Sequence, residues 1–125
     1  MAEYLTAAWA EAPIDPLAEA AAEAGIAVRL AHAFTGAPDG EVRYTATAAG
    51  GTVTYEPGLA EDADVTLTDT YRNAVAMVAG ELGPNAAFMR GQTKVVGATG
   101  TLLRALAAAG GEAYAEACER ARSSR

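Results

Sequence analysis

The chain has few side chains of the kinds that do chemistry. His32 is its only histidine, and no cysteine, aspartate or glutamate stands near it at the spacing of metal ligands, so we expect no metal site. A histidine on an apolar strand face is interpreted as a buried, hydrogen-bonded structural residue, with contact to the polar part of a ligand as the alternative. Cys118 lies between Glu116 and Glu119, and acidic neighbours raise the pKa of a thiol. We therefore interpret Cys118 as a small buried residue rather than a nucleophile.

Two other motifs could suggest a site. Glu61, Asp62 and Asp64 could offer carboxylates to Ca²⁺, but their spacing differs from that of an EF-hand, so a solvated loop is the first interpretation. The "GATG" at 97–100 is similar to a phosphate-binding loop but lacks the lysine and the serine or threonine that complete one. Nothing in the sequence assembles a nucleophile, a base and an oxyanion donor. We predict no catalytic residue, no cofactor and no enzymatic activity.

Composition limits the function classes further. The 125 residues are 51% hydrophobic and 20% charged, which is typical of one globular domain over 1–125. A net charge of −7 argues against a nucleic-acid partner and against strong attraction to an anionic membrane. No apolar run is long enough to span a bilayer, so no stable membrane insertion is expected. One cysteine and no signal-peptide pattern predict the cytoplasm.

The elements that must position these residues begin with two helical stretches. Thr6 is a candidate N-cap for the first, and Pro13 interrupts it. Asp15 is a candidate N-cap for the second, with Pro16 at its first position and Gly25 at its end.

A period of two residues then predicts strands. The segments are 28–34, 41–48, 52–56 and 64–68, and the short turns between the first three predict an antiparallel meander. Helical spacing returns over 70–82, where Asp69 or Thr70 can cap, and 85–91 is expected to form one short turn of helix. A fifth strand at 92–96 and two C-terminal helices follow. This order predicts an α+β fold, with a mostly antiparallel sheet of five strands covered by helices on one face.

Apolar stripes are the remaining signal. Tyr71, Val75, Val78 and Leu82 form one stripe, with Ala74 and Met77 beside it. Each stripe alone fits a packed core better than a ligand site. The residues by themselves therefore indicate only a domain with helices over a sheet.

The stretch 64–106 resembles the sterol carrier protein 2 family. In that family an apolar strand precedes a helix, and a segment like "NAAFMRGQTKVVGATGTLLRAL" (85–106) follows. The matching positions after the helix are Phe88, Met89, Gly91, Lys94, Val95, Gly97, Gly100 and 102–106. The opening "YLTAAWAEA" (4–12) also looks like the first helix of bacterial single-domain members. The chain departs from the family at Ala98 and Thr99, where Asn or Asp is common, and in keeping only Lys94 on its fifth strand. Its acidic charge and Ser-Ser-Arg end give no ground for carrying over peroxisomal import or attraction to membranes.

The resemblance implies that the sheet and helices enclose an apolar cavity. The residues expected to line it are Trp9, Tyr71, Val75, Met77, Val78, Leu82, Phe88, Met89, Val95, Leu102, Leu103 and Leu106. His32, Arg90 and Thr99 are candidates for contact with a head group. The partner would be a hydrophobic small molecule or lipid, and the protein would be a monomer or a homodimer.

The predicted function is a non-enzymatic intracellular carrier for a fatty acid, acyl chain, isoprenoid or sterol-like lipid. Two alternatives stay open. One is an accessory pathway protein that holds a hydrophobic intermediate and assists its isomerisation or cyclisation. The other is a domain with a filled core that serves protein contacts.

Overall fold

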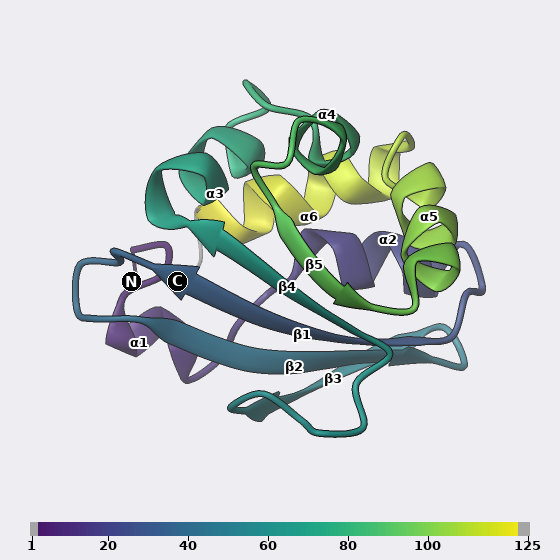
Figure 1. The fold of residues 1–125 in the computed structure, drawn as a ribbon, viewed down its shortest axis with the longest axis horizontal. Helices are drawn as coiled ribbons and strands as arrows, with labels where there is room; N and C mark the ends of the chain where they lie inside the picture. The colour runs from purple at the N-terminus through teal and green to yellow at the C-terminus, as the bar shows by residue number, and fades with distance from the viewer. Residues whose placement is uncertain (1–2, 123–125) are drawn as a thin grey trace.

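The computed structural model describes residues 3–122, and its five strands form one mixed sheet (Figure 1). The order across the sheet is β3-β2-β1-β4-β5, and only the β1–β4 pair is parallel. The strands are β1 (Val28–Thr35), β2 (Val42–Ala49), β3 (Thr52–Pro57), β4 (Val65–Thr70) and β5 (Lys94–Gly97). The predicted α+β fold with a mostly antiparallel sheet of five strands is confirmed.

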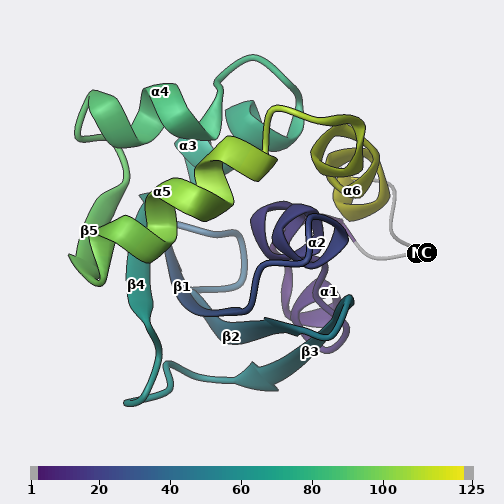
Figure 2. The same cartoon turned by 90° about the vertical axis from the view of Figure 1, so that its right-hand side faces the viewer.

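Within residues 3–122 six helices accompany the sheet, and in the side view of Figure 2 the sheet curves around α2 and α5. Helix α2 packs between the strands and α6, which holds the two layers together. The helices are α1 (Ala7–Ala10), α2 (Pro16–Glu23), α3 (Tyr71–Val78), α4 (Pro84–Met89), α5 (Thr99–Ala108) and α6 (Glu112–Arg122).

Three side chains cap helices as the sequence indicates. Thr6 accepts a hydrogen bond from the Trp9 amide, and Asp15 accepts one from the Ala18 amide. For α3 the cap is Thr70 rather than Asp69, because the Thr70 hydroxyl accepts from the Asn73 amide. Asp69 is thereby left available for another contact.

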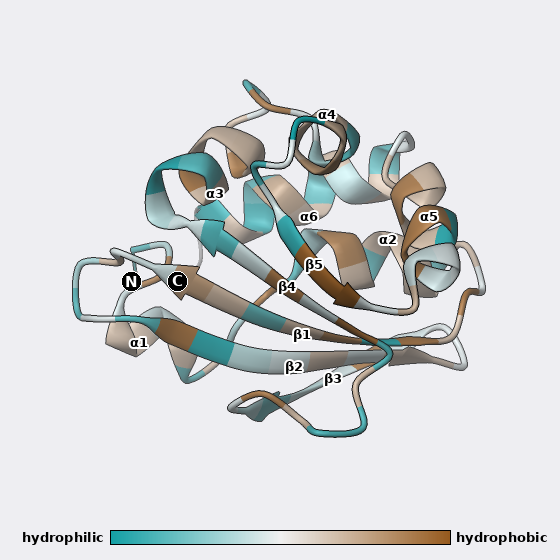
Figure 3. Cartoon of the chain, in the orientation of Figure 1, coloured by the Kyte–Doolittle hydropathy of each residue, from teal (hydrophilic) through white to brown (hydrophobic). Residues whose placement is uncertain are grey.

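The helix-facing side of the sheet carries most of the core. Leu30 and Val65, neighbours on β1 and β4, are both fully buried. Trp9 is buried too, and its indole N–H donates to the Ala121 carbonyl at 3.0 Å, which ties α1 to α6. Figure 3 shows hydrophobic stretches on β1, α5 and the end of β5.

The parallel pairing of β1 and β4 follows from the path of the chain between β3 and β4. This connection, 58–64, returns across the face of the sheet that the helices leave uncovered. The Thr45 hydroxyl donates to the Gly58 carbonyl at 2.8 Å and accepts from the Ala60 amide at 2.9 Å. The crossing brings β4 in beside β1 in the same direction, so β1 lies at the middle of the sheet.

Helix α3 differs from the predicted stripe. It ends at Val78, and Gly80 follows with φ +80, while the Glu81 amide bonds back to the Ala76 carbonyl. A glycine at this position ends a helix because it adopts a left-handed conformation without a steric penalty. The buried residues of α3 are Ala74 and Val78, whereas Val75 is 36% exposed.

Candidate ligand cavity

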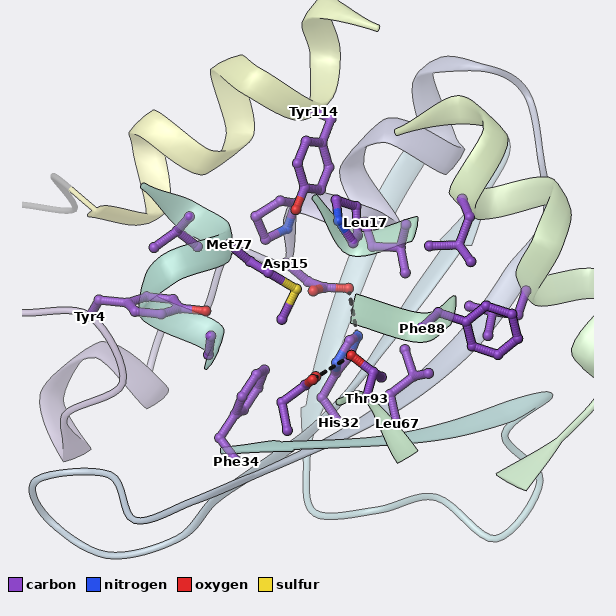
Figure 4. Close-up of a pocket in the computed structure, with 17 residues that line it drawn as sticks. Tyr4, Asp15, Leu17, His32, Phe34, Leu67, Met77, Phe88, Thr93 and Tyr114 are labelled. Atoms are coloured by element: carbon purple, nitrogen blue, oxygen red, sulfur yellow. Dashed lines mark hydrogen bonds and ion pairs between the residues drawn. The ribbon is translucent and has the colours of Figure 1, made fainter. Parts of the chain in front are cut away.

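A cavity of about 50 Å³ lies between the sheet and the helices (Figure 4). Since one water molecule needs roughly 10–15 Å³ of such space, the cavity holds only a few waters. Its lining comes from β1, β4 and all helices except α1, together with the segments that precede α1 and β5. The lining residues are Tyr4, Asp15, Pro16, Leu17, His32, Phe34, Leu67, Asp69, Ala74, Met77, Val78, Pro84, Phe88, Thr93, Leu102, Leu106 and Tyr114.

Asp15 and His32 form a buried polar pair in this lining. The Asp15 carboxylate begins α2, where its Oδ2 accepts from the Ala18 amide at 3.1 Å. The same Oδ2 lies 3.0 Å from His32 Nε2, and Oδ1 accepts from the Tyr44 hydroxyl at 3.1 Å. His32 reaches it because β1 alternates, so that His32 shares the helix-facing side with Leu30 and Phe34. One carboxylate therefore starts a helix and also holds the histidine.

The environment of His32 pulls its pKa in two directions. Burial lowers the pKa, whereas the Asp15 carboxylate and, more weakly, that of Asp69 raise it, and the net direction is upward. The other ring nitrogen, Nδ1, is buried and has no hydrogen-bond partner anywhere in residues 3–122. An unmatched buried polar atom is costly, so Nδ1 is a place where a ligand could supply the missing partner.

Asp69 and Thr93 form a second polar pair. The Thr93 hydroxyl donates to Asp69 Oδ1 at 2.5 Å, and both residues are buried. Burial raises the pKa of Asp69, while the bond from Thr93 and the charge of His32 oppose that rise. The pair joins the end of β4 to the segment just before β5.

Two phenols complete the polar part of the lining. Figure 4 shows the Tyr4 hydroxyl directed toward the cavity from the left and the Tyr114 hydroxyl from above. Burial raises the pKa of both phenols above the ordinary range. Each is therefore a neutral group that can donate a hydrogen bond.

The structure brings five of the predicted ligand-binding residues to the cavity. They are Met77, Val78, Phe88, Leu102 and Leu106. Leu102 and Leu106 face it together because they are four residues apart on α5, which leaves Leu103 pointing outward and 48% exposed. Of the proposed head-group contacts, His32 lines the cavity, whereas Arg90 and Thr99 are exposed.

The other seven lie outside the lining. Trp9 is in the core, Val75, Met89 and Leu103 are exposed, and three are partly buried elsewhere, namely Tyr71, Leu82 and Val95. Ligand contact by these seven stays a prediction that would require the cavity to enlarge.

Sequence reasoning finds His32 but misses the other polar residues of the cavity. Local sequence assigns both Asp15 and Asp69 to helix caps, which explains them without reference to a site. Asp69 comes close to His32 and Asp15 because β1 and β4 pair in parallel. Their register places Phe34 beside Asp69 and His32 beside Leu67. That register depends on the crossing of 58–64 and is not written in any local pattern.

No three His, Cys, Asp or Glu side chains within residues 3–122 are placed to hold a metal ion. No serine or cysteine is among the described residues of the lining, and the Thr93 hydroxyl donates to Asp69 rather than to His32. Cys118 is buried away from the cavity, and burial raises the pKa of its thiol. The arrangement suits binding of an apolar molecule with one hydrogen-bonding group.

Comparison with known proteins finds a matching family profile and solved structures of the same fold. The sequence profile of the SCP-2 sterol transfer family matches residues 16–108. A conserved hypothetical protein from Thermus thermophilus, described as possibly a sterol carrier protein, shares 24% identity with a TM-score of 0.67, over 97% of this chain and 91% of that one. A crystal structure of sterol carrier protein 2 shares 26% identity with a TM-score of 0.62, over 94% and 96%.

The same fold also occurs inside an enzyme. A stereoselective inverting sec-alkylsulfatase from a Pseudomonas species matches 75% of this chain at 22% identity and a TM-score of 0.52, but the match covers only 14% of the sulfatase. No curated protein matches the sequence. Among the helices of residues 3–122, none combines the length and the hydropathy needed to cross a bilayer.

Proposed function

The chain belongs to the SCP-2 sterol transfer family, and from this premise we propose that it carries a hydrophobic molecule in the cavity between its sheet and its helices. The family indicates lipid binding or transfer. We propose more narrowly that this protein makes and breaks no bonds, and that its ligand is a fatty acid, acyl chain, isoprenoid or sterol-like lipid.

The observation that carries the proposal is the position of the cavity. It lies at the meeting point of the sheet and five helices, and apolar side chains of α3, α4 and α5 form its outer wall. Burying ten methylenes contributes roughly 8 kcal/mol, and ordering a flexible chain offsets several of these. Binding near the micromolar range is therefore within reach of a long-chain lipid.

A cavity of about 50 Å³ must enlarge to admit such a chain, because ligand pockets usually measure about 300–1,000 Å³. Helix α4 is the element best suited to move. It is six residues long, no side chain caps its start at Gly83, and Ala87 is its one fully buried residue. Phe88 projects from it into the cavity lining. We propose that outward movement of α4 withdraws Phe88 and opens the space.

One observation supports the alternative of an accessory catalyst, namely the buried Asp15–His32 pair. Such a pair can move a proton if a substrate brings a labile hydrogen to His32 Nδ1. The described lining holds no serine or cysteine, and the Thr93 hydroxyl is bonded to Asp69, so the chemistry that the pair supports best is proton transfer, such as an isomerisation. The carrier function remains the proposal, and turnover of a bound ligand would contradict it.

The remaining proposals concern the setting of the protein. A single continuous core supports one domain over 1–125, and the one cysteine, which is free, supports a cytoplasmic location. The net charge of −7 supports the absence of a nucleic-acid partner. Whether the carrier is a monomer or a homodimer is open.

The test is to fill the cavity without disturbing the surface. Leu102→Trp places an indole in the lining, whereas Leu103→Trp makes the same change one residue away on the exposed side of α5. We expect Leu102→Trp to weaken displacement of a fluorescent lipid probe at least ten-fold and Leu103→Trp to leave it within two-fold.

Thermal unfolding of both variants checks that each is folded, since overpacking costs about 1–3 kcal/mol. Equal binding by the two variants would place the ligand elsewhere. Failure of the wild-type protein to bind any member of a broad lipid panel in native mass spectrometry would remove the carrier function itself.

A further inference from the structure

The polar residues in the cavity call for an explanation that an apolar ligand alone does not give. Asp15, His32, Asp69 and Thr93 are each more than nine-tenths buried and line the same small space. Burying charged and polar groups is unfavourable unless each one finds a partner. Asp15 has hydrogen-bond partners in Ala18, His32 and Tyr44. Hydrogen bonds among the four residues nevertheless leave His32 Nδ1 without a partner.

Three polar atoms at this end of the cavity can bond a ligand. His32 Nδ1 is buried with no hydrogen-bond partner within residues 3–122, Asp69 accepts from Thr93 through Oδ1 and has Oδ2 for a second bond, and the Tyr4 hydroxyl points inward (Figure 4). The hydroxyl can donate and the carboxylate oxygen accepts, while Nδ1 donates when the imidazole is protonated and accepts when it is neutral. A ligand group that both donates and accepts would satisfy this arrangement.

The charges at this end disfavour an anionic ligand. Two carboxylates line the cavity, while none of its described lining residues is an arginine or a lysine. The single possible cation, His32, is already paired with Asp15 at 3.0 Å. A ligand carboxylate would therefore meet Asp69 in a medium of low dielectric, where repulsion between like charges is strong.

We propose that the polar end of the cavity, formed by Tyr4, Asp15, His32, Asp69 and Thr93, binds the hydroxyl of a hydrophobic alcohol and selects against lipids with a carboxylate head. The hydroxyl donates to Asp69 Oδ2 and accepts from the Tyr4 hydroxyl or, when the imidazole is protonated, from His32 Nδ1. The tail then lies against Leu67, Phe88, Leu102 and Leu106 on the apolar side. This inference rests on the proposed carrier function and narrows its ligand class.

The experiment compares four ligands of one chain length: 1-dodecanol, dodecanoate, dodecylamine and dodecane. Their affinities are measured at pH 7 by displacement of a fluorescent lipid probe from the wild-type protein. We expect the alcohol to bind at least ten-fold more tightly than both the carboxylate and the alkane.

Asp69→Asn then tests the origin of the preference. It removes the negative charge with little change of shape, so the ratio of alcohol to carboxylate affinity should fall by about ten-fold. Glu61→Gln makes the same charge change on the surface and should leave the ratio unchanged. Thr93→Val serves as a second variant, because it keeps the Asp69 charge and should keep the selection against dodecanoate.

The outcomes separate the two proposals. Binding of all four ligands with equal affinity would overturn the hydroxyl site and leave the carrier function standing. Tighter binding of dodecylamine or dodecanoate than of dodecanol would also overturn it. Binding of none of the four, nor of any lipid in the broader panel, would instead count against the carrier function.

Discussion

At the scale of single residues, Asp15 and His32 form a buried pair whose protonation makes the stability of the fold depend on pH. The folded protein binds the His32 proton more tightly than an ordinary histidine with a pKa of 6.5, because the Asp15 carboxylate outweighs the cost of burial. The pair therefore stabilises the fold fully below about pH 6.5. This contribution is lost as the pH rises through the raised pKa of the folded protein, with a slope of at most about 1.4 kcal/mol per pH unit.

Asp15→Asn tests this balance. The amide oxygen still accepts from the Ala18 amide, so the cap of α2 is kept. Without the negative charge, burial dominates and the pKa of His32 falls, so the loss of stability as the pH rises above about 6.5 should disappear. Urea unfolding at several pH values measures it, with Glu61→Gln as a surface control. A variant that loses stability with pH as the wild-type protein does would show that another group causes the dependence.

At this scale the sequence predicts part of the site. His32 is buried and hydrogen-bonded, as its place on an apolar strand face indicates. Leu102 and Leu106 reach the cavity because helical spacing fixes which leucines share a face. Asp69 and Thr93 cannot be paired from sequence, since they are 24 residues apart in the chain and meet only once β4 and β5 pair.

At the scale of elements, the glycine motif at 97–100 is explained by geometry rather than by phosphate binding. Gly97 has φ +123 at the end of β5, and a Cβ built there would lie 2.4 Å from the Asp64 carbonyl oxygen. A side chain fits neither the conformation nor the space. Gly100, in the first turn of α5, has open space around it and an ordinary φ.

The two glycines therefore make a matched pair. We expect Gly97→Ala to lower the free energy of unfolding by about 2–4 kcal/mol, because the backbone of β5 must shift away from β4. Gly100→Ala should be neutral or stabilising by up to about 1 kcal/mol, since alanine favours a helix. Urea denaturation compares them, and equal effects would contradict the close contact at Gly97.

Most elements follow from local patterns, and the exceptions have a common cause. Strand alternation, the N-caps at Thr6 and Asp15, and the glycine after α2 are signals carried by neighbouring residues. The direction of β4 relative to β1 is set by a loop that folds over the far face of the sheet. Helix α3 buries Ala74 and Val78 while Val75 is exposed, because the contacts of α3 with β4 and α6 decide which face is covered. Gly80 ends the helix before Leu82.

At the scale of the whole molecule, a small cavity and a large ligand require a moving part. Helix α4 joins the wall through Phe88 and is flanked by Gly83 and Gly91. The central strand β1 is paired on both edges. We expect amides of α4 to exchange with deuterium by local opening, and those of β1 only by global unfolding.

Hydrogen exchange with and without 1-dodecanol measures this difference. The ligand should slow exchange in α4 by about the same factor as in β1, because local opening of the gate and global unfolding must both release it. Slowing in β1 without slowing in α4 would show that α4 opens with the ligand still bound and is not the gate. Protection confined to the far face of the sheet would place the ligand outside the cavity.

Asp15 caps α2 and is also part of the polar end of the cavity. Asp69 caps no helix, because Thr70 caps α3. The two carboxylates therefore differ in how freely they can change. Replacing Asp15 by a residue that cannot cap α2 disturbs the architecture, while the Asp69–Thr93 pair can vary with the scaffold intact. Redesign toward new cargo, or natural drift among relatives, should accordingly begin at Asp69 and Thr93 and leave Asp15 in place.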